Sequence, residues 1–336
     1  MLKRRGAASV AISLLMVFCS MSGSAEAKPY YEGKILTIVV GYAPGGGYDR
    51  MARMMAKYLP RYIPGKPTVL VQNMPGASSM ITANYVYNMA KPDGLTIGTF
   101  NRYLTLSQLL KMDGVRFDLR KYAWVGSEAV EAAVFTIRGD TPYKTVEDLR
   151  KAKEPVFIGN TGEIDTGSQF VPLLRDLLGP NIKFVTYPQT ADIILAIERK
   201  EVSGYGFTYT TAKTYIDRGL IRPLMRGPIS APGIENLPVN ADLTADKRLK
   251  TIIKILAAPD QLGRPFVAPP GTPADVMEIL RDAFRKVAAD PQVQEEATKL
   301  KMDVRYTSAP EVMKLIQYIL GQPADIAAEV DKNGKF

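Results

Sequence analysis

The sequence of 336 residues contains no histidine, and its single cysteine, Cys19, lies in an apolar run near the N-terminus. This composition excludes Ser-His-Asp and Cys-His catalysis, HExxH zinc sites, zinc ribbons and CxxC redox chemistry. A metal site made of carboxylates, or two carboxylates that act as acid and base in one cleft, remains possible. The sequence indicates no such pair. We therefore predict no catalytic residue, no metal site and no cofactor.

The only long apolar run lies within residues 1–27, which have the three parts of a secretory signal. Three basic residues at 3–5 precede an apolar stretch at 10–18, and Ala25-Glu26-Ala27 forms an A-x-A cleavage site. The stretch is shorter than the roughly 20 residues that cross a bilayer, which disfavours a membrane anchor. The sequence predicts export with cleavage after Ala27. Acylation of Cys19 stays open, although the bulky residue before it disfavours a lipoprotein signal.

The rest of the chain has an ordinary globular composition, with 46% hydrophobic and 23% charged residues overall and a length that suits about two domains. Removal of the signal takes away three basic residues and one acidic residue, so the formal charge falls from +9 to +7. A positive balance suits an anionic ligand. The basic residues are scattered rather than clustered, which disfavours nucleic acid as a partner. We expect a monomer without a disulfide.

Short apolar or β-branched runs alternate with helical stretches, which is typical of an α/β protein with mainly parallel sheets. Strands are predicted at 36–42, 68–72, 95–100, 134–138, 156–159 and 183–187, and helices at 50–59, 79–89, 146–151, 168–178, 191–200, 273–289 and 309–320. A crossing between domains is predicted near Ser127, beside Trp124, and a return between 226 and 266. The expected division is a signal at 1–27, domain 1 at 28–127, domain 2 at 128–245 and the rest of domain 1 at 246–336.

The first predicted strand runs into three consecutive glycines, Gly45, Gly46 and Gly47, followed by Tyr48 and Asp49. We expect Asp49 to cap a helix that begins at residue 50. Because glycines leave the backbone amides uncovered, an anion can approach the positive end of that helix. A turn without a binding role is the alternative. The loop lacks the third glycine of a dinucleotide fingerprint, and the chain has no G-K-[ST] of a P-loop.

The second predicted strand leads into another loop of small residues, which includes Gly76, Ala77 and Ser78, before a second helix. In a parallel sheet both loops leave the carboxyl ends of their strands, where such folds bind ligands. Ser78 and Ser79 either cap this helix or share a hydroxyl with a ligand. The two loops together predict a site for an anion.

Four ordered motifs resemble the Bug family, the exported solute-binding receptors of tripartite tricarboxylate transporters. The motifs are Pro44-Gly45-Gly46-Gly47-Tyr48-Asp49, Asn73-Met74-Pro75-Gly76-Ala77, Lys91-Pro92-Asp93-Gly94-Leu95-Thr96 and Ala268-Pro269-Pro270-Gly271-Thr272-Pro273. The likeness extends from about residue 34 to about residue 320. It is the combination and order of the motifs that makes the resemblance specific.

The resemblance implies a two-domain, type II periplasmic-binding-protein (Venus-flytrap) fold that closes on a small organic carboxylate. It implies a periplasmic protein that hands its ligand to integral membrane transporter subunits and performs no catalysis. An exported sensor with a signalling partner is an alternative, and an exported enzyme that uses only carboxylates is another. Carried over by position, the ligand-binding residues of the first domain are Gly45, Gly46, Gly47, Tyr48, Asp49, Gly76, Ala77 and Ser78.

The second half of the pocket departs from the family pattern. Where Gly-x-Gly-Ser-x-x-His is usual, residues 163–169 read EIDTGSQ and keep a hydroxyl at Thr166, and the Pro-Tyr-Lys-Gly and Gly-x-Val-Asp segments are also altered. From their chemistry, Tyr187, Tyr205, Tyr209 and Tyr215 are candidate aromatic walls, and Arg102 is a candidate for a second carboxylate. Glu163 and Asp165 either repel a dianion or bind an amine or hydroxyl. Which carboxylate is bound is not predicted.

Overall fold

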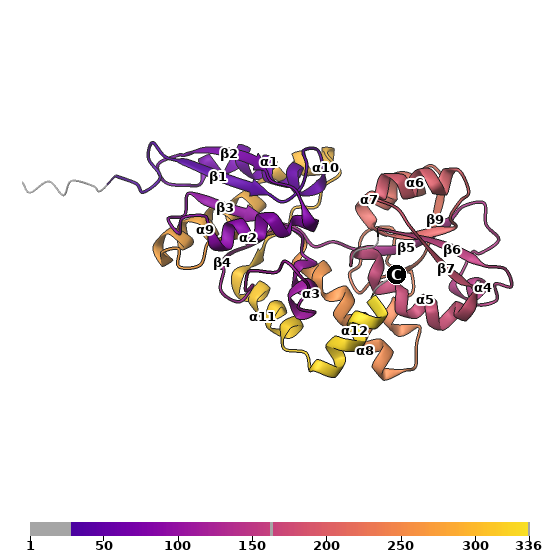
Figure 1. Cartoon of the computed structure of the whole chain (residues 1–336). Helices are drawn as coiled ribbons and strands as arrows, with labels where there is room; N and C mark the ends of the chain where they lie inside the picture. The colour runs from indigo at the N-terminus through magenta and orange to yellow at the C-terminus, as the bar shows by residue number, and fades with distance from the viewer. Residues whose placement is uncertain (1–27, 162–163, 335–336) are drawn as a thin grey trace, which may run out of the picture.

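The computed structural model describes residues 28–161 and 164–334, so the predicted signal peptide, Cys19 and Glu163 lie outside the described residues. The described chain forms two α/β lobes, each built on its own β-sheet (Figure 1). Both sheets have helices on both faces, as the sequence predicts for strands that are apolar throughout.

The first lobe is built on six strands: β1 (Ile35–Val40), β2 (Thr68–Asn73), β3 (Thr96–Thr99), β4 (Ala123–Ser127), β10 (Pro265–Ala268) and β11 (Thr307–Ser308). Their order across the sheet is β11-β4-β10-β3-β1-β2. β1 is parallel to β2 and β3, whereas β10 runs antiparallel between β3 and β4. The C-terminal part of the chain therefore completes the sheet that the N-terminal part begins.

The second lobe has five strands: β5 (Ala133–Arg138), β6 (Val156–Asn160), β7 (Ile182–Thr186), β8 (Gly204–Thr208) and β9 (Ile221–Arg226). Their order is β7-β6-β8-β5-β9. β6 is parallel to β7 and β8, and β5 is antiparallel to β8 and β9. In each lobe three adjacent parallel strands therefore end at one edge of the sheet.

Twelve α-helices lie in the described residues, with short 3-10 turns between several of them. They are α1 (Gly47–Tyr58), α2 (Met80–Asn88), α3 (Leu104–Leu109), α4 (Val146–Arg150), α5 (Val171–Leu178), α6 (Thr190–Glu198), α7 (Tyr209–Asp217), α8 (Lys247–Ala257), α9 (Ala274–Ala289), α10 (Pro291–Lys299), α11 (Ala309–Leu320) and α12 (Ala324–Gly334). Three 3-10 turns matter below: η2 (Ala77–Ser79), η3 (Thr166–Phe170) and η6 (Ala258–Leu262). No helix of the described part is both long and apolar enough to span a bilayer.

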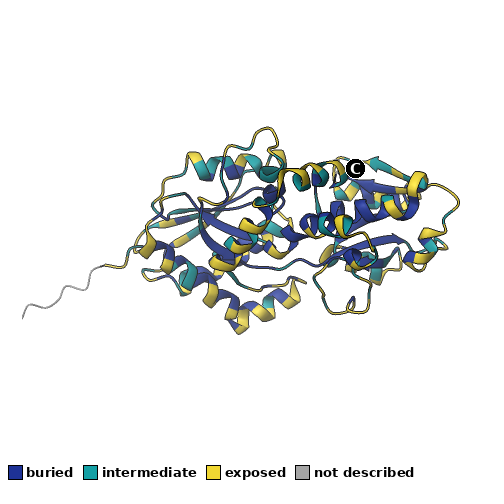
Figure 2. Ribbon diagram, turned by 90° about the horizontal axis from the view of Figure 1, so that it is seen from below, coloured by how far each residue is buried: buried dark blue, intermediate teal, exposed yellow. Residues whose placement is uncertain are grey.

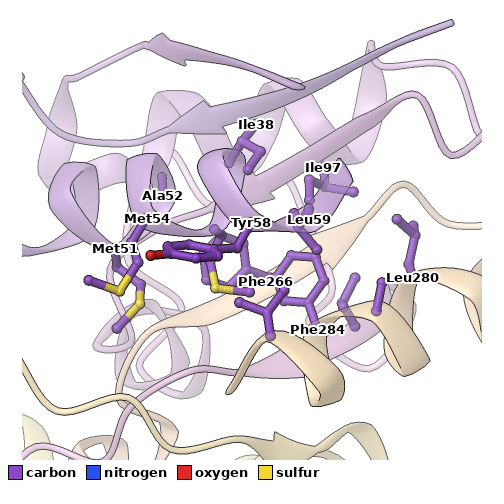
Figure 3. Packing of buried hydrophobic residues seen from close by; sticks show 14 of the residues in the cluster. Ile38, Met51, Ala52, Met54, Tyr58, Leu59, Ile97, Phe266, Leu280 and Phe284 are labelled. Carbon is purple, nitrogen blue, oxygen red and sulfur yellow. The ribbon is translucent and has the colours of Figure 1, made fainter. Parts of the chain in front are cut away.

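Alternation along the strands divides the first lobe into two apolar layers, because successive side chains of a strand point to opposite faces. On β10, Phe266 packs with α1 and α9, whereas Val267 packs on the other face with α2 and α11. Figure 3 shows the first layer, where the rings of Phe266 and Phe284 lie with centroids 5.0 Å apart. Burial on both faces fixes the register of this sheet, since a slip of one residue would exchange the layers.

The second lobe follows the same rule. Phe135 on β5 joins the layer under α4 and α5, and the neighbouring Val134 joins the layer under α6 and α7. Figure 2 shows the result for the whole molecule, with buried residues along the strands and the inner faces of helices and exposed residues on the outer helix faces. The two sheets therefore have separate cores.

Two chain segments connect the sheets, at residues 128–132 and 227–264, and their inner parts run side by side. The backbone N–H of Glu128 donates to Arg264 O at 3.1 Å, and that of Glu131 donates to Asp260 O at 3.1 Å. Gly263 has a φ of 51°, and a Cβ atom there would collide with the carbonyl oxygen of Ala129. Only glycine fits this close approach of the two connections.

The helices after the second connection do not all stay with the first lobe. Ile253 of α8 lies in the core of the second lobe, and α12 packs on α8 and α5. An apolar cluster joins these helices to α3 and α11 of the first lobe; its fully buried members include Leu106, Ile255, Leu256, Ile319 and Val330. This cluster fills the space between the lobes on one side.

Candidate ligand-binding site

A cavity of about 370 Å³ lies where the carboxyl ends of the parallel strands of the two sheets face each other. Ends of parallel strands are the usual ligand position in open α/β sheets. Other hollows include one beside α3 and α12 and one of about 490 Å³ between α7, the two connections and residues 301–305. The cavity is lined by Tyr42, Ser78 and Asn101 of the first lobe and by Thr161, Ile164, Asp165, Thr166, Pro188, Gln189, Thr190, Tyr205, Gly206, Phe207, Thr208 and Thr211 of the second.

The loop after β2 presents Ser78 to the cavity through an unusual backbone path. Ala77, Ser78 and Ser79 all have left-handed φ values, of 45°, 51° and 77°. Such values are costly outside glycine and persist where the surroundings impose them. Ser79 Oγ donates to Gly41 O at 2.9 Å and so fastens the loop to the end of β1. Ser79 is the N-cap residue of α2, but neither serine makes a side-chain capping hydrogen bond to this helix.

Two tyrosines border the cavity on the side of the first lobe. The rings of Tyr42 and Tyr48 stack with centroids 4.7 Å apart. The hydroxyl of Tyr48 accepts from the backbone N–H of Arg102 at 3.1 Å and lies 3.4 Å from Gly263 O, to which it donates. Tyr48 therefore links the glycine loop, the end of β3 and the second connection.

The helices α6 and α7 begin at the cavity wall, and neither carries a side-chain cap. Their first flanking residues are Gln189 and Thr208, and neither side chain accepts from the first turn of its helix. Thr208 Oγ1 instead donates to Thr211 Oγ1 at 3.0 Å. Free amides at a helix N-terminus carry partial positive charge and attract anions. The second lobe thus offers two anion-binding helix ends to one cavity.

Asp165 is the one lining residue, among those that the structure describes, with a carboxyl or a basic side chain. Its carboxylate accepts from Gly167 N, Thr161 Oγ1 and Tyr205 OH, each at 2.8 Å, and so caps the turn η3. Burial raises the pKa of this carboxyl, although the hydrogen bonds from Thr161 and Tyr205 oppose the shift. No lysine or arginine forms an ion pair with Asp165 within the described ranges.

Arg102 lies beneath the cavity, in a buried network rather than in the lining. Its Nε and Nη2 donate to Asp260 Oδ1 at 3.0 and 2.8 Å, and Nη2 also donates to Thr166 Oγ1 at 3.1 Å. Asp260 accepts in addition from Tyr103 OH and Gln169 Nε2, both at 2.7 Å. Burial alone would lower the pKa of Arg102, but the carboxylate of Asp260 raises it above its ordinary value. The network ties both lobes to η6.

The glycine loop differs from the sequence-based expectation in one respect. The helix α1 begins at Gly47 with Gly46 as its N-cap, so Asp49 is not the cap but lies in the first turn. Asp49 Oδ2 instead accepts from Gly45 N at 2.8 Å and from Arg53 Nε at 2.9 Å. Burial favours its protonation, but the hydrogen bonds from Arg53, Gly45 and Asn73 keep the pKa of Asp49 below its ordinary value.

The loop residues border the cavity without lining it. Gly45 and Gly46 are exposed, and Gly47 faces Arg264, whose Nη1 donates to Gly47 O at 2.8 Å. Arg264 Nη2 in turn donates to Glu131 Oε1 at 2.6 Å. The α1 N-terminus carries no side-chain cap and follows Tyr42, a lining residue, by a few positions.

Of the twelve candidate residues from the sequence, the structure brings Ser78 and Thr166 into the cavity lining. Tyr187 lies outside it, with its hydroxyl 3.4 Å from Glu201 Oε2. Tyr209 donates to Pro232 O at 3.0 Å and lines a different hollow. The other candidates do not line the cavity: Arg102 lies beneath it, and the residues of the two loops that border it are Gly45, Gly46, Gly47, Tyr48, Asp49, Gly76 and Ala77. Tyr205, considered as an aromatic wall, does line the cavity.

Several lining residues were missed, and four of the six lie directly after strands predicted from the sequence. These residues are Asn101, Thr161, Gln189, Thr190, Thr208 and Thr211. The first four lie within a few residues of the predicted strand ends at 100, 159 and 187, so a search limited to those positions would have found them. Thr208 and Thr211 follow β8, a strand that the sequence pattern did not indicate. No cluster of acidic residues suited to a metal ion occurs in the described residues.

Comparisons with known proteins agree with this architecture. Residues 51–331 match the family model described as the tripartite tricarboxylate transporter family receptor, TctC. A UPF0065 protein of Bordetella pertussis is 25% identical over 325 residues, which cover 92% of this chain and 94% of the relative.

Solved structures confirm the predicted fold class. A TctC solute-binding protein from Polaromonas is 20% identical, with a TM-score of 0.69 over 90% of this chain and 99% of that chain. MatC from Rhodopseudomonas palustris with bound malate is 18% identical, with a TM-score of 0.65 over 88% and 99%. Rpa4515 from R. palustris with adipate is 17% identical, with a TM-score of 0.68 over 89% and 98%. The chain thus has the two-lobed fold of periplasmic solute-binding proteins.

Proposed function

Because the chain belongs to the tripartite tricarboxylate transporter receptor family, we propose that it captures a small organic carboxylate in the cavity between its lobes. One observation carries this proposal: the uncapped N-termini of α6 and α7 open into a cavity bounded by the strand ends of both sheets. A volume of about 370 Å³ suits a small solute. The malate and adipate found with two similar solved structures are consistent with this ligand class.

Each lobe contributes a different set of donors to the carboxylate. Ser78 supplies a hydroxyl from the first lobe, and Asn101 supplies its amide NH2, since its Oδ1 is used by Tyr103 N at 3.0 Å. First-turn amides of α6 and α7 supply donors from the second lobe, except the N–H of Tyr209, which donates to Ala132 O at 2.7 Å. The glycine loop at the border adds the free N-terminus of α1 when the lobes approach. A ligand that contacts both lobes favours the closed state, because part of its binding energy exists only after closure.

We further propose that the protein works in the periplasm, after cleavage behind Ala27, as a monomer that delivers its ligand to integral membrane transporter subunits. The family description supports the transport role over a sensor with a signalling partner. Reversible capture requires no chemistry at the ligand, and we propose that the protein is not an enzyme.

A thermal-shift screen of residues 28–336 against mono-, di- and tricarboxylates tests the binding proposal, with nucleotides and divalent metals as controls. A ligand at a hundredfold excess over its Kd stabilises the folded state by about 2.7 kcal/mol, which is a few degrees in Tm for a chain of this size. Failure of every carboxylate to raise the Tm would contradict the proposal, and chemical conversion of a bound acid would favour the enzyme alternative.

Uptake measurements test the transport role separately. Deletion of the gene for this protein in its host should abolish high-affinity uptake of the acid found in the screen. Expression of the protein from a plasmid should restore the uptake. A sensor predicts a different pattern, in which uptake by a constitutively expressed transporter is unchanged by the deletion.

A further inference from the structure

We propose that the solute is a zwitterion, with one carboxylate and one cationic amine, rather than a dicarboxylate. This inference rests on the proposed function, since it names the substrate class of the same cavity. It follows from the distribution of charge in the lining, where one carboxylate lies opposite donors that carry no full charge.

Among the described residues, the lining contains no lysine or arginine to pair with a second carboxylate. Its charged member there is Asp165, and the other polar members are hydroxyls and amides. Arg102, the cation predicted for that role, is 6% exposed and its charge is matched by Asp260 at 2.8 Å. A dicarboxylate would therefore bring its second negative charge into a partly buried cavity beside Asp165, with no cation to offset it.

Asp165 itself lacks an opposite charge in the described part of the chain. Hydroxyls and a backbone N–H hold its carboxylate at 2.8 Å, but these are neutral donors. An ammonium group of a ligand supplies the missing charge, and its attraction to a carboxylate is strengthened when water is displaced from the cavity. Asp165 therefore marks the end of the cavity that takes the amine.

The other end takes the ligand carboxylate. The N-terminus of α7 lies at Thr208 and has no acidic residue in its cap or first turn, whereas that of α6 lies at Gln189 and has Asp192 in its first turn, outside the cavity lining. By contrast, η3 is capped by Asp165, so its N-terminus is already neutralised. The cavity thus has a negative end and a positive end, which is the charge pattern complementary to a zwitterion.

A series of four-carbon acids tests this inference on the unmodified protein. Calorimetric Kd values for residues 28–336 are compared between succinate, butyrate, 4-aminobutyrate and 2-aminobutyrate, with five-carbon homologues as a second set. We expect at least one amino acid to bind about tenfold or more tightly than the dicarboxylate and the simple acid of equal length. Equal or tighter binding of succinate or its homologue would overturn the inference but leave the proposed function standing.

If none of these probes binds while another carboxylate raises the Tm in the screen, the inference is also overturned. If no carboxylate binds at all, the proposed function fails with it. The two failures are therefore distinguishable in one set of measurements.

A variant that removes the charge of Asp165 tests whether this residue binds the amine of the ligand. Asp165→Asn keeps the size and retains a good helix-capping residue, and we expect it to narrow the Kd ratio between the amino acid and the simple acid to within about threefold. Asp148→Asn is the matched control, because Asp148 also lies in a capping box of the second lobe but is half-buried at the surface and outside the cavity. An unchanged ratio in Asp165→Asn, or an equal change in both variants, would contradict the role of Asp165.

Discussion

At the scale of single residues, the glycine loop offers a clean test of whether its amides approach the ligand. Gly46 has an ordinary extended conformation, with φ −73° and ψ 171°, and a Cβ atom there would meet only Ala43 O at 3.9 Å. Valine is therefore tolerated by the backbone at this position. The side chain would instead cover the N-terminus of α1.

We predict that Gly46→Val leaves the protein folded, at a cost of about 1 kcal/mol from a poorer N-cap, and weakens carboxylate binding at least tenfold by blocking the amide. Urea unfolding and calorimetry measure the two quantities. Affinity within about threefold of the unmodified protein would show that the ligand does not reach this loop.

The buried ion pair between Arg102 and Asp260 gives a second test at the scale of single residues. We predict that Arg102→Met destabilises the protein by about 3–5 kcal/mol, because it leaves a buried carboxylate without its partner. Denaturant unfolding measures the change. Arg120→Met is the control, since Arg120 pairs with Asp118 at the surface and such pairs contribute little. Equal destabilisation by both variants would argue against the buried pair as the cause.

The ion-pair partners of Arg102 and Arg264 escaped sequence analysis for one reason. The motifs indicated which loops leave the strand ends, but the partner of Arg102 is 158 positions away and the partner of Arg264 is 133 positions away. Pairings over such distances depend on how the two lobes are joined, and no local pattern encodes them. Asp49 was misplaced for the opposite reason, because its carboxylate turns back to an amide only four residues away.

At the scale of elements, the first connection contains a buried carboxyl group, that of Glu128, whose titration should make the stability of the fold depend on pH. Glu128 follows β4 directly, is 0% exposed, and neither of its carboxyl oxygens has a hydrogen-bond partner in the described residues. Burial raises the pKa of Glu128 well above its ordinary value. The folded protein therefore holds this proton more tightly than the unfolded chain does.

The tighter binding of this proton stabilises the folded protein fully below the pKa of Glu128 in the unfolded chain, which is about 4.3. The stabilisation is lost as the pH rises towards the pKa of Glu128 in the folded protein. We predict that Glu128→Gln is more stable than the unmodified protein at neutral and alkaline pH and that the difference disappears near pH 4. Thermal unfolding between pH 4 and 9 measures this. A difference that stays constant over that range would exclude titration of Glu128 as its source.

Elements with a strong local pattern were predicted well. All six strands that were predicted from the sequence occur close to their predicted positions, as do the long helices α9 and α11. Other elements were missed, including the short apolar strands β4 and β10. Four of the missed elements have weaker signals: β8 contains two glycines, β9 contains a proline, and α8 and α12 carry many charged residues. Their placement depends on packing against the second lobe rather than on intrinsic preference.

At the scale of the whole molecule, the two-domain arrangement predicted from the family resemblance is confirmed by the similar solved structures. The exact division at 127 and 245 stays a prediction. The arrangement predicts that the lobes approach each other when a ligand fills the cavity. X-ray scattering of residues 28–336 should show a smaller radius of gyration with saturating ligand, and no change with a nucleotide as control.

Trp124 should not report this motion, although its position near the first connection suggested that it would. Its side chain is 2% exposed in the core of the first lobe, and Nε1 donates to Leu119 O at 2.8 Å. Its emission is therefore expected to stay constant on binding. Unchanged scattering with a ligand of confirmed saturation would contradict closure and indicate a rigid cleft.

The helix α12 has a consequence for the kind of motion that is open to the lobes. α11 packs in the core of the first lobe and α12 on the helices of the second, so residues 321–323 are a third strap across the same gap. Three residues span at most about 10 Å even when fully extended. The edge of the molecule at residues 321–323 cannot open. The lobes therefore rotate about this edge, and the cavity opens on the opposite side. The lobes can therefore separate widely only on the side away from α12, and we expect the proposed solute to enter and leave from that side.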